Sequence, residues 1–256
     1  MKQEKFEKLV WIMEKLRSDE GCPWDRKQTN ETLLPYLIEE TYELVDSIEK
    51  NDREEIKEEL GDLLLQVIFQ AQIAKEKGWF DIYEVIENLC EKLIRRHPHV
   101  FGEKRIKSAE EVLKHWEKIK SEEGKDNSLL SGVPRSMPPL TRAYYIQKKA
   151  EKVGFDWKNW EDVLKKIVEE IEELKESISK REKEKITEEI GDLLFSIVNL
   201  ARFLNIFPDL ALRKTIEKFE VRFKYMEEKA KAQGKTLEEM SLEEMDKIWE
   251  EGKERL

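Results

Sequence analysis

Residues 39–71 read EETYELVDSIEKNDREEIKEELGDLLLQVIFQA, and residues 169–201 read EEIEELKESISKREKEKITEEIGDLLFSIVNLA. A shift of 130 positions aligns the two stretches without a gap, so that Glu39 falls on Glu169. Each copy contains a Glu-Glu-x-x-Glu block and then a Glu-x-x-Asp block that runs into Leu-Leu. A repeat of this length predicts two related domains in tandem.

The acidic blocks are spaced so that a helix would gather them on one face. Residues three apart in a helix share a face, so Glu40 lies beside Glu43, and Glu59 beside Asp62. Two such helices packed antiparallel bring four carboxylates together, and a divalent ion relieves their repulsion. Oxygen ligands favour a hard cation such as Mg²⁺. The predicted metal ligands are Glu40, Glu43, Glu59 and Asp62 in the first copy and Glu170, Glu173, Glu189 and Asp192 in the second.

Two other interpretations of the acidic blocks are a solvated helix face and a different kind of metal site. Asp and Glu number 57 in this chain, so a single acidic block is typical of a solvated helix face. Two blocks at one spacing, repeated in register, favour a site. A di-iron bundle would need Glu-x-x-His pairs, and the sequence has none.

Gly61 and Gly191 occupy equivalent positions inside the second acidic block of each copy. Glycine weakens a helix interior by about 1 kcal/mol relative to alanine, so its presence there needs a reason. Close approach of another helix, or room for a ligand, would supply one.

Helical periodicity runs through both halves, and no alternating β-branched run occurs, so the predicted fold class is all-α. The expected helices lie at about 2–18, 35–50, 53–77, 81–96, 141–153, 160–179, 182–204, 209–232 and 241–254, with a loop at 21–30. The predicted domains are residues 1–100 and 141–256. They are joined by a connector, 101–140, that holds one helix at about 108–122 and a segment rich in Gly, Ser and Pro.

Charge and composition exclude several classes of protein. The net charge is −10, which argues against a nucleic-acid binder, because such a protein needs a basic stripe. No apolar run approaches 18 residues, so we expect no membrane span. Cys22 and Cys90 are too few for a disulfide framework, which favours the reducing cytoplasm.

The second copy carries cations that the first lacks. Lys185 stands where the first copy has Glu55, Lys218 where it has Asn88, and Arg222 replaces a lysine. Lys218 and Arg222 are four residues apart and share a helix face. A polyphosphate needs such donors besides a metal, and Trp249 can stack on a base. We therefore expect the second copy to be the stronger catalytic candidate.

These motifs resemble the MazG nucleoside triphosphate pyrophosphohydrolases. Besides the acidic blocks, the similar segments are Cys-Pro-Trp-Asp at 22–25, Arg-Arg-His-Pro-His-Val-Phe at 95–101 and Val-Gly-Phe-Asp-Trp at 153–157. The resemblance implies two tandem bundles of the all-α NTP pyrophosphatase type that dimerise. It also implies Mg²⁺-dependent conversion of a nucleoside triphosphate to the monophosphate and pyrophosphate.

Residue roles follow from the same resemblance. Glu170, Glu173, Glu189 and Asp192 would hold the metal. Lys185, Lys218 and Arg222 would contact phosphates, and Trp249 would lie near the nucleoside. The departures at Glu55 and Asn88 put hydrolysis by the first copy in doubt.

The expected reaction is attack of water on a phosphoanhydride. Glu169, next to a metal ligand, is a candidate to orient or deprotonate that water, which completes the predicted catalytic set of Glu169, Glu170, Glu173, Glu189 and Asp192. Two alternatives remain open. One is a non-catalytic helical scaffold or regulatory binder; the other is a narrower enzyme for dUTP or a phosphoribosyl-ATP-like substrate.

Overall fold

The computed structural model describes residues 2–102, 108, 111–112, 115–116, 119 and 128–255. Within these residues every regular element is a helix, which confirms the all-α prediction. The chain forms two compact units, residues 1–124 and 125–256. The finer division into 1–100, 101–140 and 141–256 stays a prediction, and the helix expected at about 108–122 lies largely outside the described residues.

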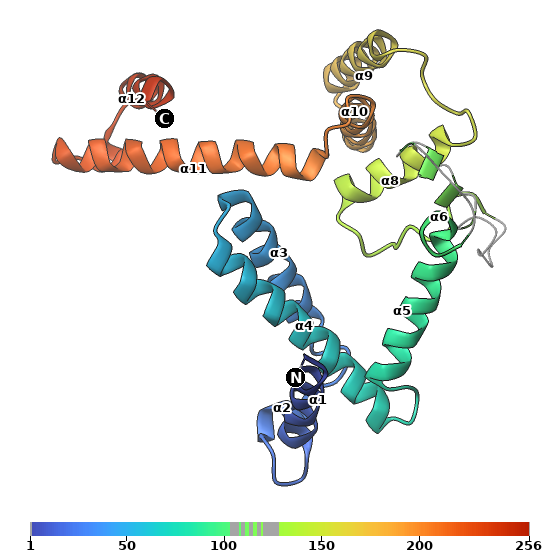
Figure 1. The fold of residues 1–256 in the computed structure, drawn as a ribbon. Coiled ribbons are helices and arrows are strands. Elements are labelled where there is room, and N and C mark those ends of the chain that lie inside the picture. The colour runs from blue at the N-terminus through green and yellow to red at the C-terminus, as the bar shows by residue number, and fades with distance from the viewer. Residues whose placement is uncertain are drawn as a thin grey trace. The chain divides into compact units, whose positions relative to one another are not determined.

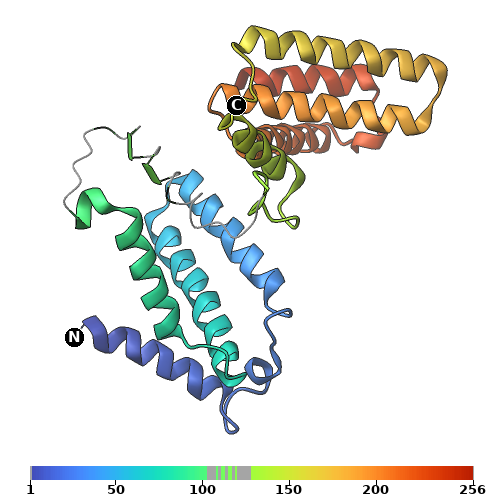
Figure 2. The same cartoon turned by 90° about the vertical axis from the view of Figure 1, so that its right-hand side faces the viewer.

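The first unit is built on a long antiparallel hairpin (Figure 1). Helices α3 and α4 form the hairpin, α1 and α5 pack against α4, and α2 and α6 are short. Their bounds are α1 Lys2–Arg17, α2 Pro23–Lys27, α3 Leu34–Lys50, α4 Arg53–Glu76, α5 Ile82–Arg96 and α6 Pro98–Phe101. Figure 2 shows α3 and α4 lying side by side along their length.

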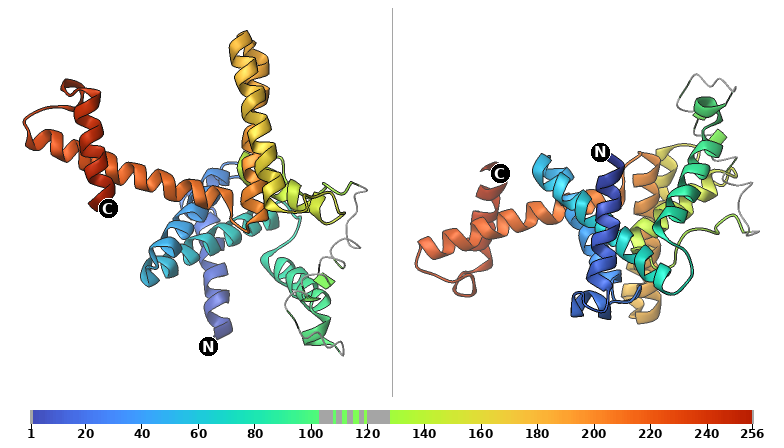
Figure 3. Two further views of the ribbon diagram at one scale, coloured as in Figure 1. Left: turned by 90° about the horizontal axis from the view of Figure 1, so that it is seen from above. Right: turned by 60° about the horizontal axis from the view of Figure 1, so that its bottom comes forward.

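The second unit repeats the hairpin and adds a longer final arm. Helices α9 and α10 pair as α3 and α4 do, and α8 packs against α10. The bounds are α8 Pro139–Glu151, α9 Trp160–Lys180, α10 Lys183–Phe203, α11 Pro208–Ala232, the 3₁₀ turn η1 Leu237–Glu239 and α12 Leu242–Arg255. Figure 3 shows α11 running away from the α9–α10 hairpin and carrying α12 near its far end.

The two hairpin turns are the same turn. Helices α3 and α9 each end on a residue in the left-handed conformation, Asn51 and Arg181, both with φ of 57° and ψ of 32°. In each turn the next backbone N–H donates to the carbonyl of a buried serine, Ser47 or Ser177. Asparagine tolerates this conformation well, whereas arginine adopts it at some cost. Residues 130 positions apart therefore occupy equivalent places in the two hairpin turns.

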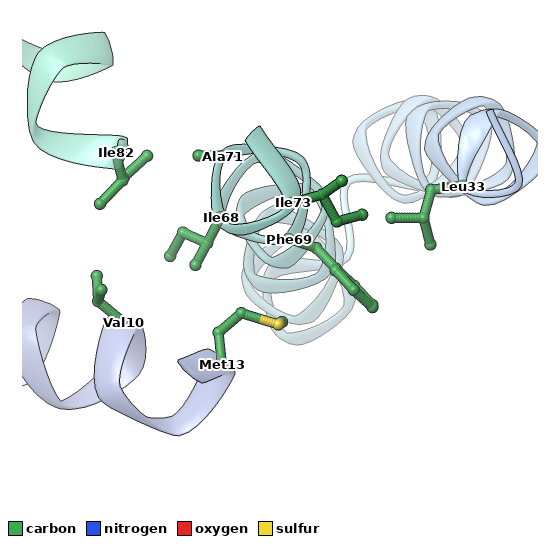
Figure 4. Packing of buried hydrophobic residues seen from close by; sticks show 8 residues of the cluster. All are labelled: Val10, Met13, Leu33, Ile68, Phe69, Ala71, Ile73 and Ile82. Carbon is green, nitrogen blue, oxygen red and sulfur yellow. The ribbon is translucent and has the colours of Figure 1, made fainter. Parts of the chain in front are cut away.

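Residues from α1, α4 and α5 and from the start of α3 form the core of the first unit (Figure 4). The buried members are Val10, Met13, Leu33, Ile68, Phe69, Ala71, Ile73 and Ile82. In the second unit a separate cluster closes α11 on α12 and consists of Met226, Ala230, Met240 and Ile248. The first cluster holds α1 and α5 against α4, and the second holds α12 against α11.

Helix positions agree with the sequence patterns to within about two residues. Three short elements, α2, α6 and η1, were not expected. Among the described helices none alone has the length and apolarity of a membrane span; α10 and α11 pass that test only as a pair bent by 104°.

Candidate active site

Three of the four carboxylates that the sequence analysis placed together in the second hairpin converge. Glu170 and Glu173 come from α9 and Glu189 from α10, and one oxygen of each lies within 4.8 Å of the others. Glu170 is 4% exposed and Glu189 is 7% exposed. Burying like charges at this separation is costly unless a cation joins them.

The pKa of Glu189 is raised above its ordinary value. Removal of the carboxyl group from water is the main cause, and the negative charge of Glu173 adds to it. Lys185 opposes the shift, while Asp192 and Glu170 reinforce it. The other three predicted metal ligands of this copy, together with Lys185, thus act on Glu189, although Asp192 is not one of the three acids whose oxygens converge.

Lys166 is already seated in this cluster. Its Nζ lies 2.9 Å from Oε1 of Glu170, four residues along α9, and 2.7 Å from Oε1 of Glu169, three residues along. These two contacts raise the pKa of Lys166. Lys166 was not among the predicted site residues, although its place four residues before Glu170, a predicted metal ligand, was a usable signal.

The first hairpin gathers the equivalent acids. One oxygen from each of Glu40, Glu43 and Glu59 lies within 4.8 Å of the others. Burial and the charge of Asp62 raise the pKa of Glu40, while a hydrogen bond from Gln66 opposes the change. Burial also raises the pKa of Glu59, with the charge of Glu43 as the next cause. Tyr36 stands at the position of Lys166, so this copy lacks the resident cation at that place.

Arg222 and Trp249 lie together, but on different helices from the carboxylates. The guanidinium carbon of Arg222 is 5.9 Å from the centre of the Trp249 ring, and Phe219 packs on the same ring at 5.1 Å. Lys218 belongs to α11 as well. Helix α11 packs against α8, α10, η1 and α12. The predicted site residues therefore form two separate groups. The carboxylates and Lys185 lie on the α9–α10 hairpin, and Arg222 and Trp249 lie on the arm formed by α11 and α12.

The hairpin donors suit a divalent cation. They are all oxygen donors, they come from two rigid helices, and they approach closely enough for one ion to bridge them. Burial, reinforced by neighbouring negative charges, raises the pKa of Glu189 and of Glu40, and a cation would offset both effects.

Gly61 and Gly191, which occupy equivalent positions in the two copies, face open space. A Cβ atom at either position would meet nothing within 4 Å. Close approach of a second helix within the unit is therefore not their reason.

Two helical units with matching acidic hairpins define a duplicated all-α protein of the nucleotide pyrophosphohydrolase class. The family model described as "MazG nucleotide pyrophosphohydrolase domain" matches residues 28–101 and again residues 158–226. The chain belongs to this family, which confirms the resemblance, the tandem arrangement and the class of hydrolase that the motifs implied.

Relatives match over nearly the full length. The chain is 55% identical over 250 residues to the "Nucleoside triphosphate pyrophosphohydrolase/pyrophosphatase MazG" of Thermotoga maritima, covering 97% of this chain and 95% of the relative. It is 44% identical over 254 residues to the "Nucleoside triphosphate pyrophosphohydrolase" of Escherichia coli, covering 97% of both. A crystal structure of a MazG-related protein from Thermotoga maritima is 36% identical, covers 45% of this chain and 98% of its own, and has a TM-score of 0.40.

Proposed function

We propose that this protein hydrolyses nucleoside triphosphates to the monophosphate and pyrophosphate, with Mg²⁺, mainly at the second hairpin. The observation that carries the proposal is the convergence of Glu170, Glu173 and Glu189 within 4.8 Å, with Lys185 acting on the same cluster. The names of the Thermotoga and Escherichia relatives support nucleoside triphosphates as the substrate class.

Glu170, Glu173, Glu189 and Asp192 would hold the metal. Bound Mg²⁺ would neutralise phosphate oxygens and lower the pKa of a coordinated water. Helices α9 and α10 fix the carboxylates in place, so little reorganisation is needed when the substrate arrives. Glu169 is our candidate to orient or deprotonate the attacking water, because it adjoins Glu170 and is held by Lys166.

Lys185, Lys218 and Arg222 are the proposed phosphate contacts, and Trp249 the proposed nucleoside contact. Arg222 and Trp249 lie on an arm that leaves the hairpin of its own unit (Figure 3). That arm also exposes apolar side chains, among them Ile216, Phe219 and Val221. We infer a homodimer in which the arm of one copy reaches the hairpin of the other and completes the site.

The first hairpin is proposed to bind metal and to hydrolyse poorly. Glu40, Glu43, Glu59 and Asp62 reproduce the ligand set, but Glu55 and Asn88 stand where the second copy has lysines. A triphosphate would therefore meet fewer cations there. Cys22 and Cys90 are both free thiols, in keeping with the proposed cytoplasmic location, and we propose no nucleic-acid or membrane partner.

Incubation of the purified chain with each dNTP and NTP, with and without Mg²⁺, tests the proposal. We expect pyrophosphate and monophosphate in equal amounts, only when the metal is present. Release of orthophosphate instead would contradict the assigned bond. No product from any nucleotide would favour the scaffold interpretation, and cleavage of dUTP alone would favour the narrower enzyme.

A further inference from the structure

A cavity of about 710 Å³ opens beside the second acidic cluster. Helices α8, α9 and α10 and the loop that follows α8 supply its walls. Glu170 and Asp192 line one part of it, so the cavity is continuous with the proposed metal site. Its volume is in the range of about 300–1,000 Å³ that is usual for small-molecule sites.

Aromatic side chains also line the cavity. Phe155 and Trp157 come from the loop after α8, and Phe195 comes from α10. All three are exposed, Phe155 most of all. Flat apolar surfaces next to a phosphate-binding centre suit a nucleobase, because every base offers a face for stacking.

One residue that lines the cavity has a buried polar atom without a hydrogen-bond partner. Gln147 on α8 is 7% exposed and lines the cavity. Its Nε2 donates to the carbonyl of Phe195 at 2.9 Å, whereas its Oε1 is buried without a hydrogen bond. A buried acceptor left unpaired is costly, so such an atom points to a ligand that donates to it.

Asn199 supplies the complementary donor. Its Oδ1 accepts from Nε and Nη2 of Arg202, at 3.1 and 2.8 Å. Because both bonds use the oxygen, they fix the orientation of the amide and leave Nδ2 to donate. Arg202 is 6% exposed and also pairs with Glu151 and Asp156, so it ties Asn199 to the loop that carries Trp157.

In the first unit a core side chain fills the equivalent place. The shift of 130 positions puts Phe69 where the second unit has Asn199. Phe69 is 3% exposed and belongs to the packed core with Met13 and Leu33 (Figure 4). The guanidinium of Arg17 covers its ring, with 5.4 Å from Cζ to the ring centre. A core in one copy therefore replaces a cavity in the other.

We propose that this cavity is the nucleobase pocket of the second copy, in which Gln147 accepts from the base, Asn199 donates to it, and Arg202 positions Asn199. The proposal rests on the proposed function for the phosphate end of the ligand. It assigns base selectivity to residues outside the acidic motifs, so that Trp249 would contact the sugar and not stack on the base. It also gives a steric reason, besides the missing lysines, why the first copy would hydrolyse poorly.

Binding of uncharged nucleosides to the full-length chain tests the pocket without the reaction. Adenosine, guanosine, cytidine and uridine are titrated in EDTA and followed by ligand-observed NMR, since a neutral probe is not repelled by metal-free carboxylates. The variants are Asn199→Phe, which copies the first unit, and Gln147→Met, which keeps the side-chain size. Gln72→Met is the control, because Gln72 occupies the Arg202 position of the first copy.

We expect the wild type and Gln72→Met to bind the same nucleosides. Asn199→Phe should weaken that binding about tenfold or more, and Gln147→Met should reduce the difference between the four bases. Circular dichroism establishes whether each variant is folded. If Asn199→Phe does not fold, the binding measured with Gln147→Met tests the pocket. Wild-type binding in both folded variants, or no nucleoside binding by the wild type, would overturn the proposal.

Hydrolysis assays keep this proposal separate from the proposed function. If the cavity variants lose nucleosides but the wild type releases no pyrophosphate, the pocket stands and the reaction is wrong. If the wild type hydrolyses nucleotides and both variants keep its KM for every base, the reaction stands and the pocket is wrong.

Discussion

Lys166 and Glu170 form an ion pair across one turn of α9, with 2.9 Å between Nζ and Oε1. Glu170 is a proposed metal ligand and is almost fully buried. The lysine therefore balances, in the absence of metal, a charge that the metal would otherwise balance. The first copy has Tyr36 at this position and has no equivalent pair.

Replacing Lys166 by methionine should separate stability from metal affinity. Without the ammonium group Glu170 is left buried and unpaired, so the melting temperature of the metal-free protein should fall by several degrees. Removing a nearby positive charge should tighten Mg²⁺ binding about fivefold, on a Coulomb term of about 1 kcal/mol. Calorimetric titration with Mg²⁺ and thermal melts in EDTA measure both effects.

Lys165→Met is the matched control, because Lys165 pairs with Asp162 on the same helix but outside the cluster. It should change neither quantity appreciably. Weaker Mg²⁺ binding by the Lys166 variant would mean that the lysine supports the metal site and does not compete with it.

Glu189→Gln should stabilise the metal-free protein and abolish activity. The raised pKa of Glu189 means that the folded state holds this proton more tightly than the unfolded chain. Its contribution to stability is therefore favourable below the ordinary carboxyl pKa and is lost as the pH rises through the raised value. The gain in melting temperature should be clear at pH 8 and should vanish near pH 4.

Glu188→Gln, at the exposed neighbouring residue, serves as the comparison for Glu189→Gln. A melting temperature in EDTA that is equal for wild type and Glu189→Gln at pH 8 would argue against mutual repulsion in the cluster.

Equivalent substitutions in the two copies should have unequal effects. Glu173→Ala should lower hydrolysis more than about a hundredfold, as loss of a charged ligand to a catalytic ion does. Glu43→Ala, at the same position of the first copy, should retain most activity. Steady-state kinetics with a good substrate compares them directly, and a collapse in Glu43→Ala would reverse the ranking of the copies.

Mixing two inactive variants tests the proposed dimer. Glu173→Ala spoils the hairpin and Arg222→Ala spoils the arm. If the arm acts on the partner, each mixed dimer has one intact site, and an equal mixture regains about a quarter of wild-type activity. Activity no higher than that of either variant alone would place the arm and hairpin of one site in the same chain.

The helices and the acidic cluster could be predicted because both depend on local spacing. Helices α4 and α10 begin and end close to the predicted limits, since Asp52 caps one and apolar periodicity marks both. The cluster needed only the further assumption that two adjacent helices pair in antiparallel fashion. By contrast, α2 has only five residues and no side-chain cap, so it is too short to show an apolar period despite the proline at its start.

The nucleobase cavity could not be predicted, because it depends on packing between elements distant in sequence. Asn199 and Gln147 come from different helices, and neither belongs to a motif. The repeat did contain a signal, namely an asparagine aligned with Phe69 of a buried helix. Only the structure shows that this change exchanges a packed core for a cavity. The direction in which α11 leaves the hairpin could not be predicted from the sequence either, because apolar periodicity marks a helix but not its direction.

A crystal structure with Mn²⁺ and a non-hydrolysable nucleoside triphosphate tests the central claim most directly. Anomalous scattering should place manganese among the carboxylates of Glu170, Glu173, Glu189 and Asp192, in contact with the phosphates. Nucleotide bound elsewhere, or bound with those carboxylates free of metal at saturating Mn²⁺, would contradict the account.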